Sequence, residues 1–497
     1  MTKANATSLE AVDGRELSST AARGATFTIL GQIVRMAVMF VGTVILARLL
    51  TPSDFGLMAI VVSLVAFGEL VRDFGLSTAA AREVELSRAQ QSNLFWVNSA
   101  LGGVLTVAAY FSAQTIAAIF RQPDLVGMVE SLSLVFVING FATQFRAELN
   151  RRLDFKSLAV VDTAPPVVGL IAAILFIFLG QASYWALVCQ QLATAIVGLV
   201  LAVIAAKWMP GLPNRKGSIR NLLSFGLGLF GTQSIAYVTR NMDNLMLGYF
   251  WGPTVLGIYS RGYQLLMVPI NQIAAPLTRV AVPILTRVVT ERDRFMSFLM
   301  TGQLIGGVGL GVVYGVFFGM ASPLVQVAFG SEWSGMVPVV QALAVGGVFR
   351  ALNQVTFWIF LAKDATGAQF RFYLFSQPFV VASMLAGLPW GAIGVAIGHS
   401  IGYGLNWLLS YWWCGRETET DMAPLLRAAV KGILCFTIPV GMISVFIQSL
   451  VDGAIVELLL CSVGASLYLI LLGFVSSYAL ETYRTGIRAV RKVVQKT

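Results

Sequence analysis

Residues Leu46–Ile60 read LARLLTPSDFGLMAI and form a short polar joint between two apolar runs. A similar joint, LGYFWGPTVLGIYSR, returns at Leu247–Arg261. Pro52 aligns with Pro253 at an offset of 201 residues (253 − 52), and one leucine and one glycine of each stretch keep that offset. A repeated helix–turn–helix joint predicts two related halves. It favours a membrane protein whose functional site lies between these halves.

Composition places the chain in the membrane class. Hydrophobic residues make up 57% of its 497 residues and charged residues only 12%, and the mean hydropathy is +0.77. A soluble protein cannot bury that much apolar surface, so the excess is expected to face lipid. The net charge of +10 could suggest nucleic acid. However, the cations are spread over many short joints, which favours membrane topology and no nucleic-acid partner.

Neither cysteine nor histidine forms a metal-binding pattern. The four cysteines lie in or beside apolar runs without CxxC spacing, which favours packing over a zinc site or a disulfide. His399 is the only histidine, and a single imidazole cannot assemble a metal cluster. Packing within an apolar helix and a role in proton relay both stay open for it.

The apolar runs are long enough to cross a bilayer and follow one another with short joints. We therefore expect an all-α integral membrane protein with about fourteen transmembrane helices. The expected spans are 25–49, 55–80, 93–119, 125–147, 158–179, 183–206, 219–250, 254–285, 296–319, 334–362, 370–388, 390–413, 425–447 and 453–478.

The distribution of Lys and Arg predicts the side of the membrane that each joint faces. Odd-numbered joints such as LTPSD, WGP and GLP are short and nearly free of cations, whereas even-numbered joints and the C-terminal tail carry Lys and Arg. The positive-inside rule therefore predicts that both termini are cytosolic. Each half holds an even number of spans, so both halves start on the cytosolic side and the repeat is parallel.

The repeat continues beyond the first joint and divides the chain. Tyr184-Trp185-Ala186 at the start of the sixth span resembles Pro389-Trp390-Gly391 at the start of the twelfth. The expected segments are a cytosolic tail at 1–22, an N-lobe of spans 1–6 at 23–210, a C-lobe of spans 7–12 at 211–415, spans 13–14 at 416–480 and a basic cytosolic tail at 481–497.

Six arginines lie within apolar spans. Each costs roughly 2.5–3.5 kcal/mol there, so it needs a partner, a water-filled cavity or a route to the interface. They are the expected substrate-binding residues: Arg35, Arg72, Arg240, Arg261, Arg279 and Arg350. Polar residues recur beside several of them at helical spacing, as Gln233, Tyr237 and Asn244 do around Arg240. This pattern favours a wet, cationic space between the lobes.

Three acidic residues, Glu69, Asp73 and Asp243, are candidates for ion coupling or for pairing with a nearby arginine. Arg72 lies between Glu69 and Asp73 in the sequence and fits an ion network as well as a substrate role. Arg279 fits either a substrate contact or snorkelling to the interface. The remaining arginines fit either cavity lining or structural pairing.

Two further patterns concern the shape and packing of helices. Span 8 carries prolines at seven-residue steps from Pro269 to Pro283, which favours bending. Span 9 carries Gly311, Gly315 and Gly319 at every fourth position, which predicts a close-packing face. The sequence contains no HExxH or P-loop motif, and the joints expected on the outer side are too short for a catalytic domain.

The sequences LARLLTPSDFGLMAI, RNMDNLMLGYFWG and LGIYSRGYQLLMVPI resemble the polysaccharide transporter family, which includes Wzx-type and WzxC-like lipid-linked oligosaccharide flippases. That family belongs to the superfamily that also holds MATE drug exporters and MurJ-like lipid II flippases. The resemblance runs through spans 1–12, and spans 13–14 match the family's fourteen-span form.

The resemblance implies a transporter of the bacterial inner membrane and not an enzyme. It would move undecaprenyl-diphosphate-linked oligosaccharide units to the periplasmic leaflet by alternating access, for exopolysaccharide or lipopolysaccharide biosynthesis. Arginine forks suit diphosphate oxygens, so Arg35, Arg240, Arg261 and Arg350 are the candidates for lining its cavity. Besides this substrate and membrane lipids, a polysaccharide polymerase and co-polymerase are expected partners of a monomeric chain. No cofactor is expected apart from a coupled proton or sodium ion.

Two alternatives stay open. A cation-coupled multidrug antiporter of the MATE type would favour acidic residues in the cavity, whereas arginines are in excess here. A membrane glycan polymerase or ligase would need a large outer loop, which the short joints do not offer.

Overall fold

The computed structural model describes residue 36 and residues 38–75, 87–152, 154–180, 183–214 and 220–494. These residues form helices joined by short turns, and no strand occurs among them. Eleven helical segments are long and apolar enough to cross a membrane. Two of these, Arg240–Arg287 and Thr366–Thr418, are too long for one crossing, because about 20 residues span the hydrocarbon.

A glycine with positive φ divides each long segment. Gly252 (φ 78°) breaks the first immediately before Pro253. The second is broken by a 3-10 turn at Leu388–Trp390 and by Gly391 (φ 66°). With the shorter apolar helix Val38–Leu49, the described residues therefore account for fourteen spans, and the predicted all-α membrane fold is confirmed.

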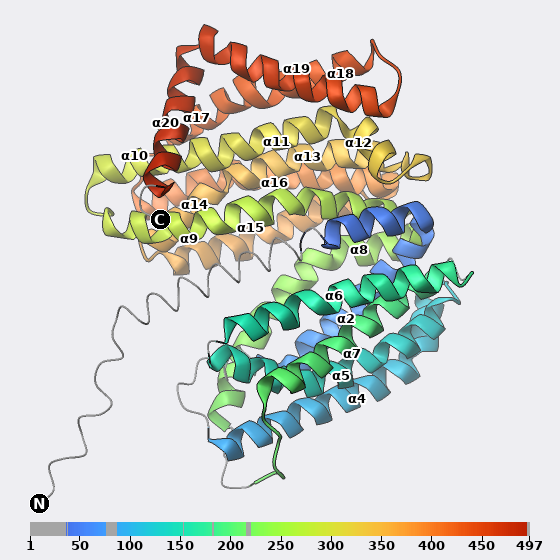
Figure 1. The fold of residues 1–497 in the computed structure, drawn as a ribbon. Coiled ribbons are helices and arrows are strands. Elements are labelled where there is room, and N and C mark those ends of the chain that lie inside the picture. The colour runs from blue at the N-terminus through green and yellow to red at the C-terminus, as the bar shows by residue number, and fades with distance from the viewer. Residues whose placement is uncertain are drawn as a thin grey trace, which may run out of the picture. The chain divides into compact units, whose positions relative to one another are not determined.

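Contacts divide the chain into two compact units, Met1–Val238 and Thr239–Thr497. This boundary lies inside a helix, α8, whereas the sequence places the lobe boundary at residues 210–211. In the first unit, α4, α5 and α7 lie side by side (Figure 1). Its helices after Val38–Leu49 are α2 (Pro52–Asp73), α4 (Arg88–Phe120), α5 (Leu125–Arg151), α6 (Phe155–Phe178), α7 (Trp185–Ala206) and the start of α8 (Arg220–Pro269).

The joint at Leu46–Ile60 is a capped helix start. Thr51 and Asp54 form a capping box at the start of α2, with Pro52 in the first turn, which satisfies backbone N–H groups that the helix leaves unpaired. The end of α2 corrects the prediction. The span was expected to reach residue 80, but the helix ends at Asp73 because Phe74 (φ 47°) adopts the left-handed conformation. Hydropathy does not register such a backbone change.

The second unit contains the rest of α8 and all later helices. Among these, α11, α13 and α16 pack together, and α18 packs on both α11 and α19 (Figure 1). The elements are η1 (Ile270–Ala274), α9 (Ala275–Arg287), α10 (Arg292–Gly302), η2 (Gln303–Val308), α11 (Gly309–Gly319), α12 (Ala321–Ala328), η3 (Ser331–Trp333), α13 (Met336–Leu352), α14 (Gln354–Ala362), α15 (Thr366–Ala386), η4 (Leu388–Trp390), α16 (Gly391–Thr418), α17 (Ala423–Gly432), η5 (Ile433–Thr437), α18 (Ile438–Gln448), α19 (Ala454–Val475) and α20 (Ser477–Val494).

The predicted glycine face of span 9 is confirmed. A Cβ added at Gly315 would lie 2.5 Å from the carbonyl oxygen of Thr437, and one at Gly319 would lie 2.7 Å from that of Gly441. These glycines therefore let α11 approach η5 and α18 at backbone distance. In span 8, the α-helical winding changes to π-helix directly after Pro269, since a proline cannot donate to the helical ladder.

In each unit, one hydrogen bond connects two turns at one end of the unit. In the first unit, the backbone N–H of Tyr184 donates to Oδ1 of Asp54 (2.9 Å), which links the joint before α2 to the joint before α7. In the second unit, Nε1 of Trp251 donates to the carbonyl of Leu388 (2.8 Å), which links the Gly252 break to the joint before α16. The two hydrogen bonds occur at corresponding joints of the sequence repeat.

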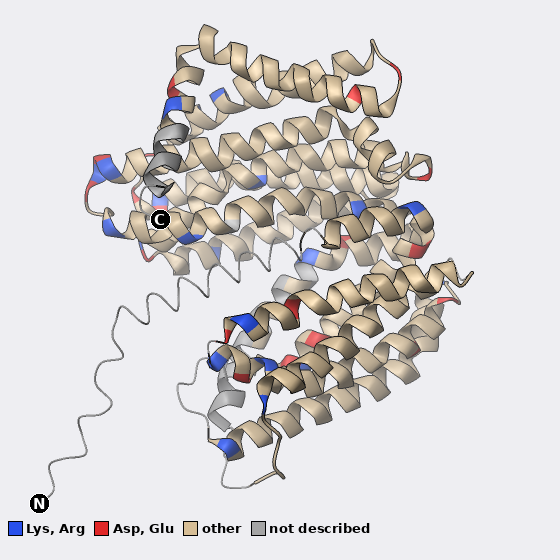
Figure 2. Cartoon of the chain, viewed as in Figure 1, with Lys and Arg blue, Asp and Glu red and all other residues tan. Residues whose placement is uncertain are grey.

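Charges and apolar side chains are distributed as a bilayer requires. Most described Lys and Arg residues lie at or near helix ends, and a few lie along the helices (Figure 2). Large apolar side chains are widely exposed, including Phe474 (85%) and Val475 (86%) of α19. Residues 481–494 of the predicted basic tail belong to α20, which begins at Ser477.

Candidate functional site

Arg350 lies at the centre of an aromatic cluster in the second unit. It sits near the end of α13, and Nη1 of its guanidinium donates to the hydroxyl of Tyr263 on α8 (3.1 Å). The same atom lies 3.4 Å from Nε2 of His399 on α16. The guanidinium carbon lies 4.5 Å from the ring centroid of Tyr403, also on α16, in a cation–π contact.

A small residue on α13 allows this cluster to form. A Cβ added at Gly346 would lie 2.6 Å from Nδ1 of His399 and 2.7 Å from Oγ of Ser400. Any larger residue would push α16 away. Gly346 is one turn before Arg350, so the close approach of the helices brings His399 and Tyr403 to the guanidinium.

Asp243 lies at one edge of the same cluster. It is buried (5% exposed), and its Oδ2 accepts a hydrogen bond from the hydroxyl of Tyr259 (2.7 Å). The Tyr259 ring stacks on that of Tyr263 with centroids 6.1 Å apart, and Tyr263 contacts Arg350. Two residues predicted separately from the sequence, Asp243 and Arg350, are therefore connected through two tyrosines.

The Arg350 guanidinium keeps donors for a further partner. No carboxylate lies within 4 Å of it in the described part of the chain, and its hydrogen bonds there use Nη1 alone. The side chain is half-buried. A guanidinium held by neutral groups with unused N–H donors is suited to an oxyanion such as a phosphate.

The other predicted arginines of the second unit differ in exposure. Arg240 on α8 and Arg279 on α9 are exposed. Arg261 on α8 is half-buried and donates from Nη1 to Oε1 of Gln264, one turn away. None of these three belongs to the Arg350 cluster. Arg35 of the first unit lies outside the described residues.

Arg72 is held in an ion pair inside the first unit. It is 5% exposed, its Nε lies 2.9 Å from Oε2 of Glu69, and its Nη1 donates to Oδ1 of Asn98 on α4 (3.4 Å). Asp73 is half-buried and is the last residue of α2. The structure thus contains an Arg72–Glu69 ion pair, which is one part of the ion network that the sequence left open for Arg72 as an alternative to a substrate role.

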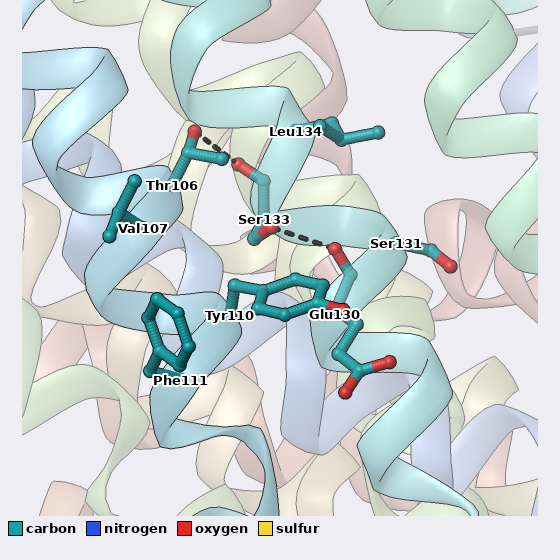
Figure 3. A pocket seen from close by; sticks show the side chains of 8 residues that line it. All are labelled: Thr106, Val107, Tyr110, Phe111, Glu130, Ser131, Ser133 and Leu134. Carbon is teal, nitrogen blue, oxygen red and sulfur yellow. Dashed lines mark hydrogen bonds between the residues drawn. The ribbon is translucent and has the colours of Figure 1, made fainter.

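A shallow pocket of about 380 Å³ lies between α4 and α5 of the first unit (Figure 3). Val107 and Phe111 line it and are largely exposed (56% and 77%). Its polar wall includes Thr106, whose hydroxyl donates to the carbonyl of Ser133, and Glu130. None of the predicted substrate-binding arginines lines this pocket.

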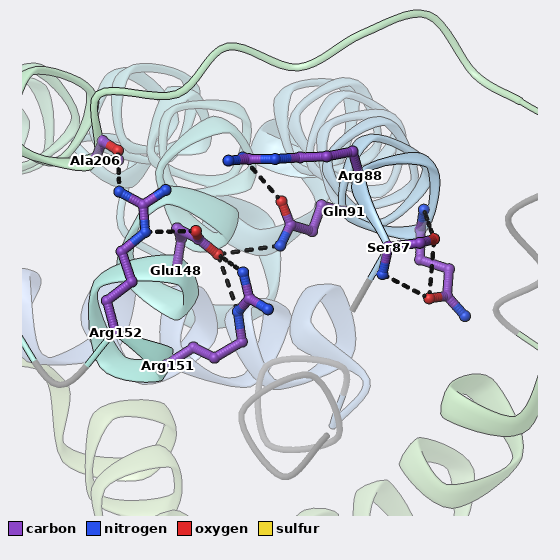
Figure 4. Close-up of polar contacts among 8 residues, drawn as sticks. Ser87, Arg88, Gln91, Glu148, Arg151, Arg152 and Ala206 are labelled. Atoms are coloured by element: carbon purple, nitrogen blue, oxygen red, sulfur yellow. Dashed lines mark hydrogen bonds and ion pairs between the residues drawn. The ribbon is translucent and has the colours of Figure 1, made fainter. Parts of the chain in front are cut away.

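A second charge cluster, centred on Glu148, was not predicted. Glu148 near the end of α5 is 3% exposed and accepts hydrogen bonds from Arg151 (2.6 Å) and Arg152 (2.6 Å). Gln91 on α4 donates to the same carboxylate (3.1 Å), and Arg152 also donates to the carbonyl of Ala206 at the end of α7 (3.1 Å) (Figure 4). Glu148 therefore connects three helix ends. The sequence signal for this cluster was the position of Glu148, three and four residues before the two arginines at the end of the same helix.

Sequence reasoning also missed the aromatic partners of Arg350. Tyr259 and Tyr263 are four residues apart, as are His399 and Tyr403, so each pair shares one helix face. Aromatic residues are common in membrane helices, and this spacing alone does not show that the two faces meet at an arginine.

The fold is that of a class of multi-pass membrane transporters. It is similar to the lipid II flippase MurJ in its inward closed conformation, with a TM-score of 0.68 and 15% identity over 90% of this chain and 98% of MurJ. It is also similar to an inward-facing MATE-family multidrug resistance transporter of the MOP superfamily, with a TM-score of 0.60 and 16% identity over 80% of this chain and 99% of that one.

The sequence defines the family within that class. The model of the polysaccharide biosynthesis protein family matches residues 45–338, and the chain belongs to this family. It is 26% identical to the lipopolysaccharide biosynthesis protein WzxC of Escherichia coli over 78% of this chain and 79% of WzxC. It is 25% identical to the teichuronic acid biosynthesis protein TuaB of Bacillus subtilis over 83% and 88%. The predicted family, its transporter class and its multi-pass membrane location are confirmed.

Proposed function

We propose that this protein is a flippase that moves undecaprenyl-diphosphate-linked oligosaccharide units across the bacterial inner membrane by alternating access. A diphosphate headgroup carrying sugars cannot cross hydrocarbon without groups that replace its hydration. Arg350 is the residue we assign to the diphosphate. The observation that carries this assignment is its half-buried guanidinium, held by Tyr263, Tyr403 and His399 with no carboxylate within 4 Å in the described chain.

The family and the relatives support the polysaccharide part of this proposal. WzxC and TuaB are named for lipopolysaccharide and teichuronic acid biosynthesis, and MurJ is named as a flippase of lipid II. Arg240, Arg261 and Arg279 stay candidates for later steps along the substrate path. Cytosolic termini, a monomeric state, a coupled proton or sodium ion, and a polymerase and co-polymerase as partners remain part of the proposal.

The test uses a strain that lacks this protein and accumulates lipid-linked oligosaccharide in the cytosolic leaflet. The native chain should restore surface polysaccharide, whereas Arg350→Ala should not, although it reaches the membrane at the native level. Arg294→Ala is the matched control, because Arg294 is an exposed residue of the same unit that pairs with Glu291. Full restoration by Arg350→Ala would overturn the assignment. Altered drug susceptibility with unchanged polysaccharide would favour the MATE-type antiporter instead.

A further inference from the structure

Residues 207–214 follow α7 and lie against the start of α4. They contain no helix or strand, and we call them the linker strap. The backbone N–H of Gly211 donates to Oγ of Ser92 (2.9 Å), and the carbonyl of Gly211 accepts from Nε1 of Trp96 (2.9 Å). Both partners belong to α4, so the middle of the strap is bonded to this helix.

The two ends of the linker strap are fixed as well. The side chain of Asn93 accepts from the N–H of Asn214 (2.8 Å) and donates to its carbonyl (2.7 Å). At the other end, Trp208 is buried and packs edge-on against Phe145 (centroids 5.5 Å apart) in a hydrophobic core of the first unit. The strap is therefore a fixed part of the first unit.

Two large apolar side chains of the strap lie outside this packing. Met209 is 76% exposed and Leu212 is 84% exposed. Hydrogen bonds at Gly211 and Asn214 hold the backbone on both sides of Leu212, so the strap cannot turn it inward. Exposure of such side chains to water is costly, and it marks a surface that contacts lipid or another molecule.

The strap meets α4 at the end of an exposed apolar stripe. Trp96, Val104, Val107 and Phe111 are exposed, and steps of eight, three and four residues place them on one side of the helix. Such a stripe on a membrane-spanning helix contacts lipid, and tryptophan is typical of the membrane–water interface. The strap is bonded to Trp96, so it lies at this interface.

The backbone of the strap suits the edge of a bilayer. Backbone groups near hydrocarbon must be paired, because little water reaches them. The N–H groups of Gly211 and Asn214 are paired with side chains of α4. Pro210 and Pro213 have no N–H to pair.

Cations lie at both ends of the strap in the sequence. Lys207 is its first residue and is exposed, and Arg215 and Lys216 follow it directly. Lys and Arg beside an apolar segment favour the level of the lipid phosphates, where they attract anionic headgroups. This charge pattern favours a lipid surface as the partner over an apolar surface of another protein.

We infer that the linker strap is an interfacial anchor that inserts Met209 and Leu212 into the lipid leaflet beside the start of α4. In the predicted topology this is the cytosolic leaflet. A joint whose cations predict an aqueous location thus contacts the membrane through two apolar side chains. The connection between the two units follows the lipid surface as far as Asn214. This contact does not depend on which substrate the protein moves.

The experiment measures how fast single thiols react with a water-soluble maleimide in the full-length protein, embedded in nanodiscs of phosphatidylethanolamine and phosphatidylglycerol. The thiolate is the reactive form, and an apolar environment disfavours it. Met209→Cys and Leu212→Cys should therefore react at least about tenfold more slowly than a thiol in water. The native protein gives the background, since its four cysteines lie in membrane helices.

Two controls on α4 bracket the level of the strap. Arg88 and Val104 lie eight residues before and after Trp96 (96 − 88 and 104 − 96), about 12 Å along the helix in each direction, and both are exposed. Arg88→Cys should react as a thiol in water does, and lipid should protect Val104→Cys. All four variants must elute as monodisperse protein from size exclusion, which shows that they are folded.

A nitroxide attached at the same four positions gives a second measurement. In lipid it collides more often with oxygen than with a water-soluble nickel chelate, and in water this preference is reversed. The anchor requires the lipid result in both Met209→Cys and Leu212→Cys. Reaction as fast as in Arg88→Cys, or nitroxides that prefer the nickel chelate, would overturn the anchor and place the strap in water.

Discussion

Asp54 and Tyr184, 130 residues apart in the sequence, are joined by a hydrogen bond from the backbone N–H of Tyr184 to Oδ1 of Asp54 (2.9 Å). Asp54 also bonds Thr51 in the capping box of α2. Asp54→Ala removes both interactions and should lower the free energy of unfolding by about 1–2 kcal/mol. Asp54→Asn keeps an oxygen acceptor and should lose less. Denaturant unfolding in detergent measures both, and equal losses would contradict the proposed tie to Tyr184.

Glu148→Gln should be among the most destabilising single changes in the first unit. The substitution leaves Arg151 and Arg152 without the buried carboxylate they share, which is expected to cost about 3 kcal/mol. Glu291→Gln is the matched control, since Glu291 pairs with Arg294 at the same three-residue spacing but on the surface, and it should leave the unfolding midpoint unchanged. A similar midpoint shift in both variants would show that burial of Glu148 is unimportant.

Gly315→Ala should destabilise the second unit, because the new Cβ would lie 2.5 Å from the backbone carbonyl of Thr437. Separating α11 from η5 is expected to cost about 1–3 kcal/mol. Gly309, at the start of the same helix, has nothing within 4 Å of an added Cβ. Gly309→Ala should therefore be neutral or stabilise the helix by up to about 1 kcal/mol. Thermal unfolding measures the change in stability of each variant. The packing interpretation requires Gly315→Ala to lower the stability and Gly309→Ala to leave it unchanged or raise it.

Tyr263→Phe and Tyr403→Phe should affect transport differently. Tyr263 accepts a hydrogen bond from Arg350 through its hydroxyl, so its loss is expected to reduce export about tenfold. Tyr403 contacts Arg350 through its ring face, which phenylalanine retains, so Tyr403→Phe should remain close to native. Rates of polysaccharide export in the complemented strain provide the measurement. The geometry would be contradicted if Tyr403→Phe were the more defective variant.

Asp154 at the start of α6 should make the stability of the protein depend on pH. The side-chain hydroxyl of Ser157 (2.7 Å) and its backbone N–H (3.1 Å) donate to the Asp154 carboxylate and hold its pKa below the usual range. A lowered folded-state pKa stabilises the protein above the unfolded value of about 3.9, and this contribution is lost as the pH falls through the folded-state pKa. The unfolding midpoint should therefore drop more steeply on acidification in the native protein than in Asp154→Asn. Ser157→Ala should reduce the slope as well.

Hydropathy and turn chemistry predicted most of the fold. Each span requires a run of apolar residues of bilayer length, and each joint carries glycine, proline or a capping residue, so both are visible in the sequence. The close packing of α11 was visible in the spacing of Gly311, Gly315 and Gly319. The end of α2 was missed, because the left-handed residue there is a phenylalanine, Phe74, a residue type that rarely adopts this conformation and that hydropathy counts as part of the span.

The candidate site was predictable only in part. An arginine in an apolar span attracts attention because of its cost, which is how Arg350 and Arg72 were found. The same rule could not separate them, because their roles depend on their partners. Arg72 has a carboxylate on its own helix, whereas the partners of Arg350 come from helices about 50 and 90 residues away in the sequence. Only the packing of α8, α13 and α16 shows which side chains contact Arg350, and these side chains are neutral.

The single imidazole of this chain lies at the arginine that we assign to the substrate. Isotope-labelled histidine in the native protein would therefore give the signals of one ring, with no assignment problem. The chemical shifts of its two nitrogens differ between the tautomers and the imidazolium. A magnetic resonance spectrum of the intact transporter in a lipid bilayer would thus report the state of the Arg350 site during turnover, with no probe attached to the protein.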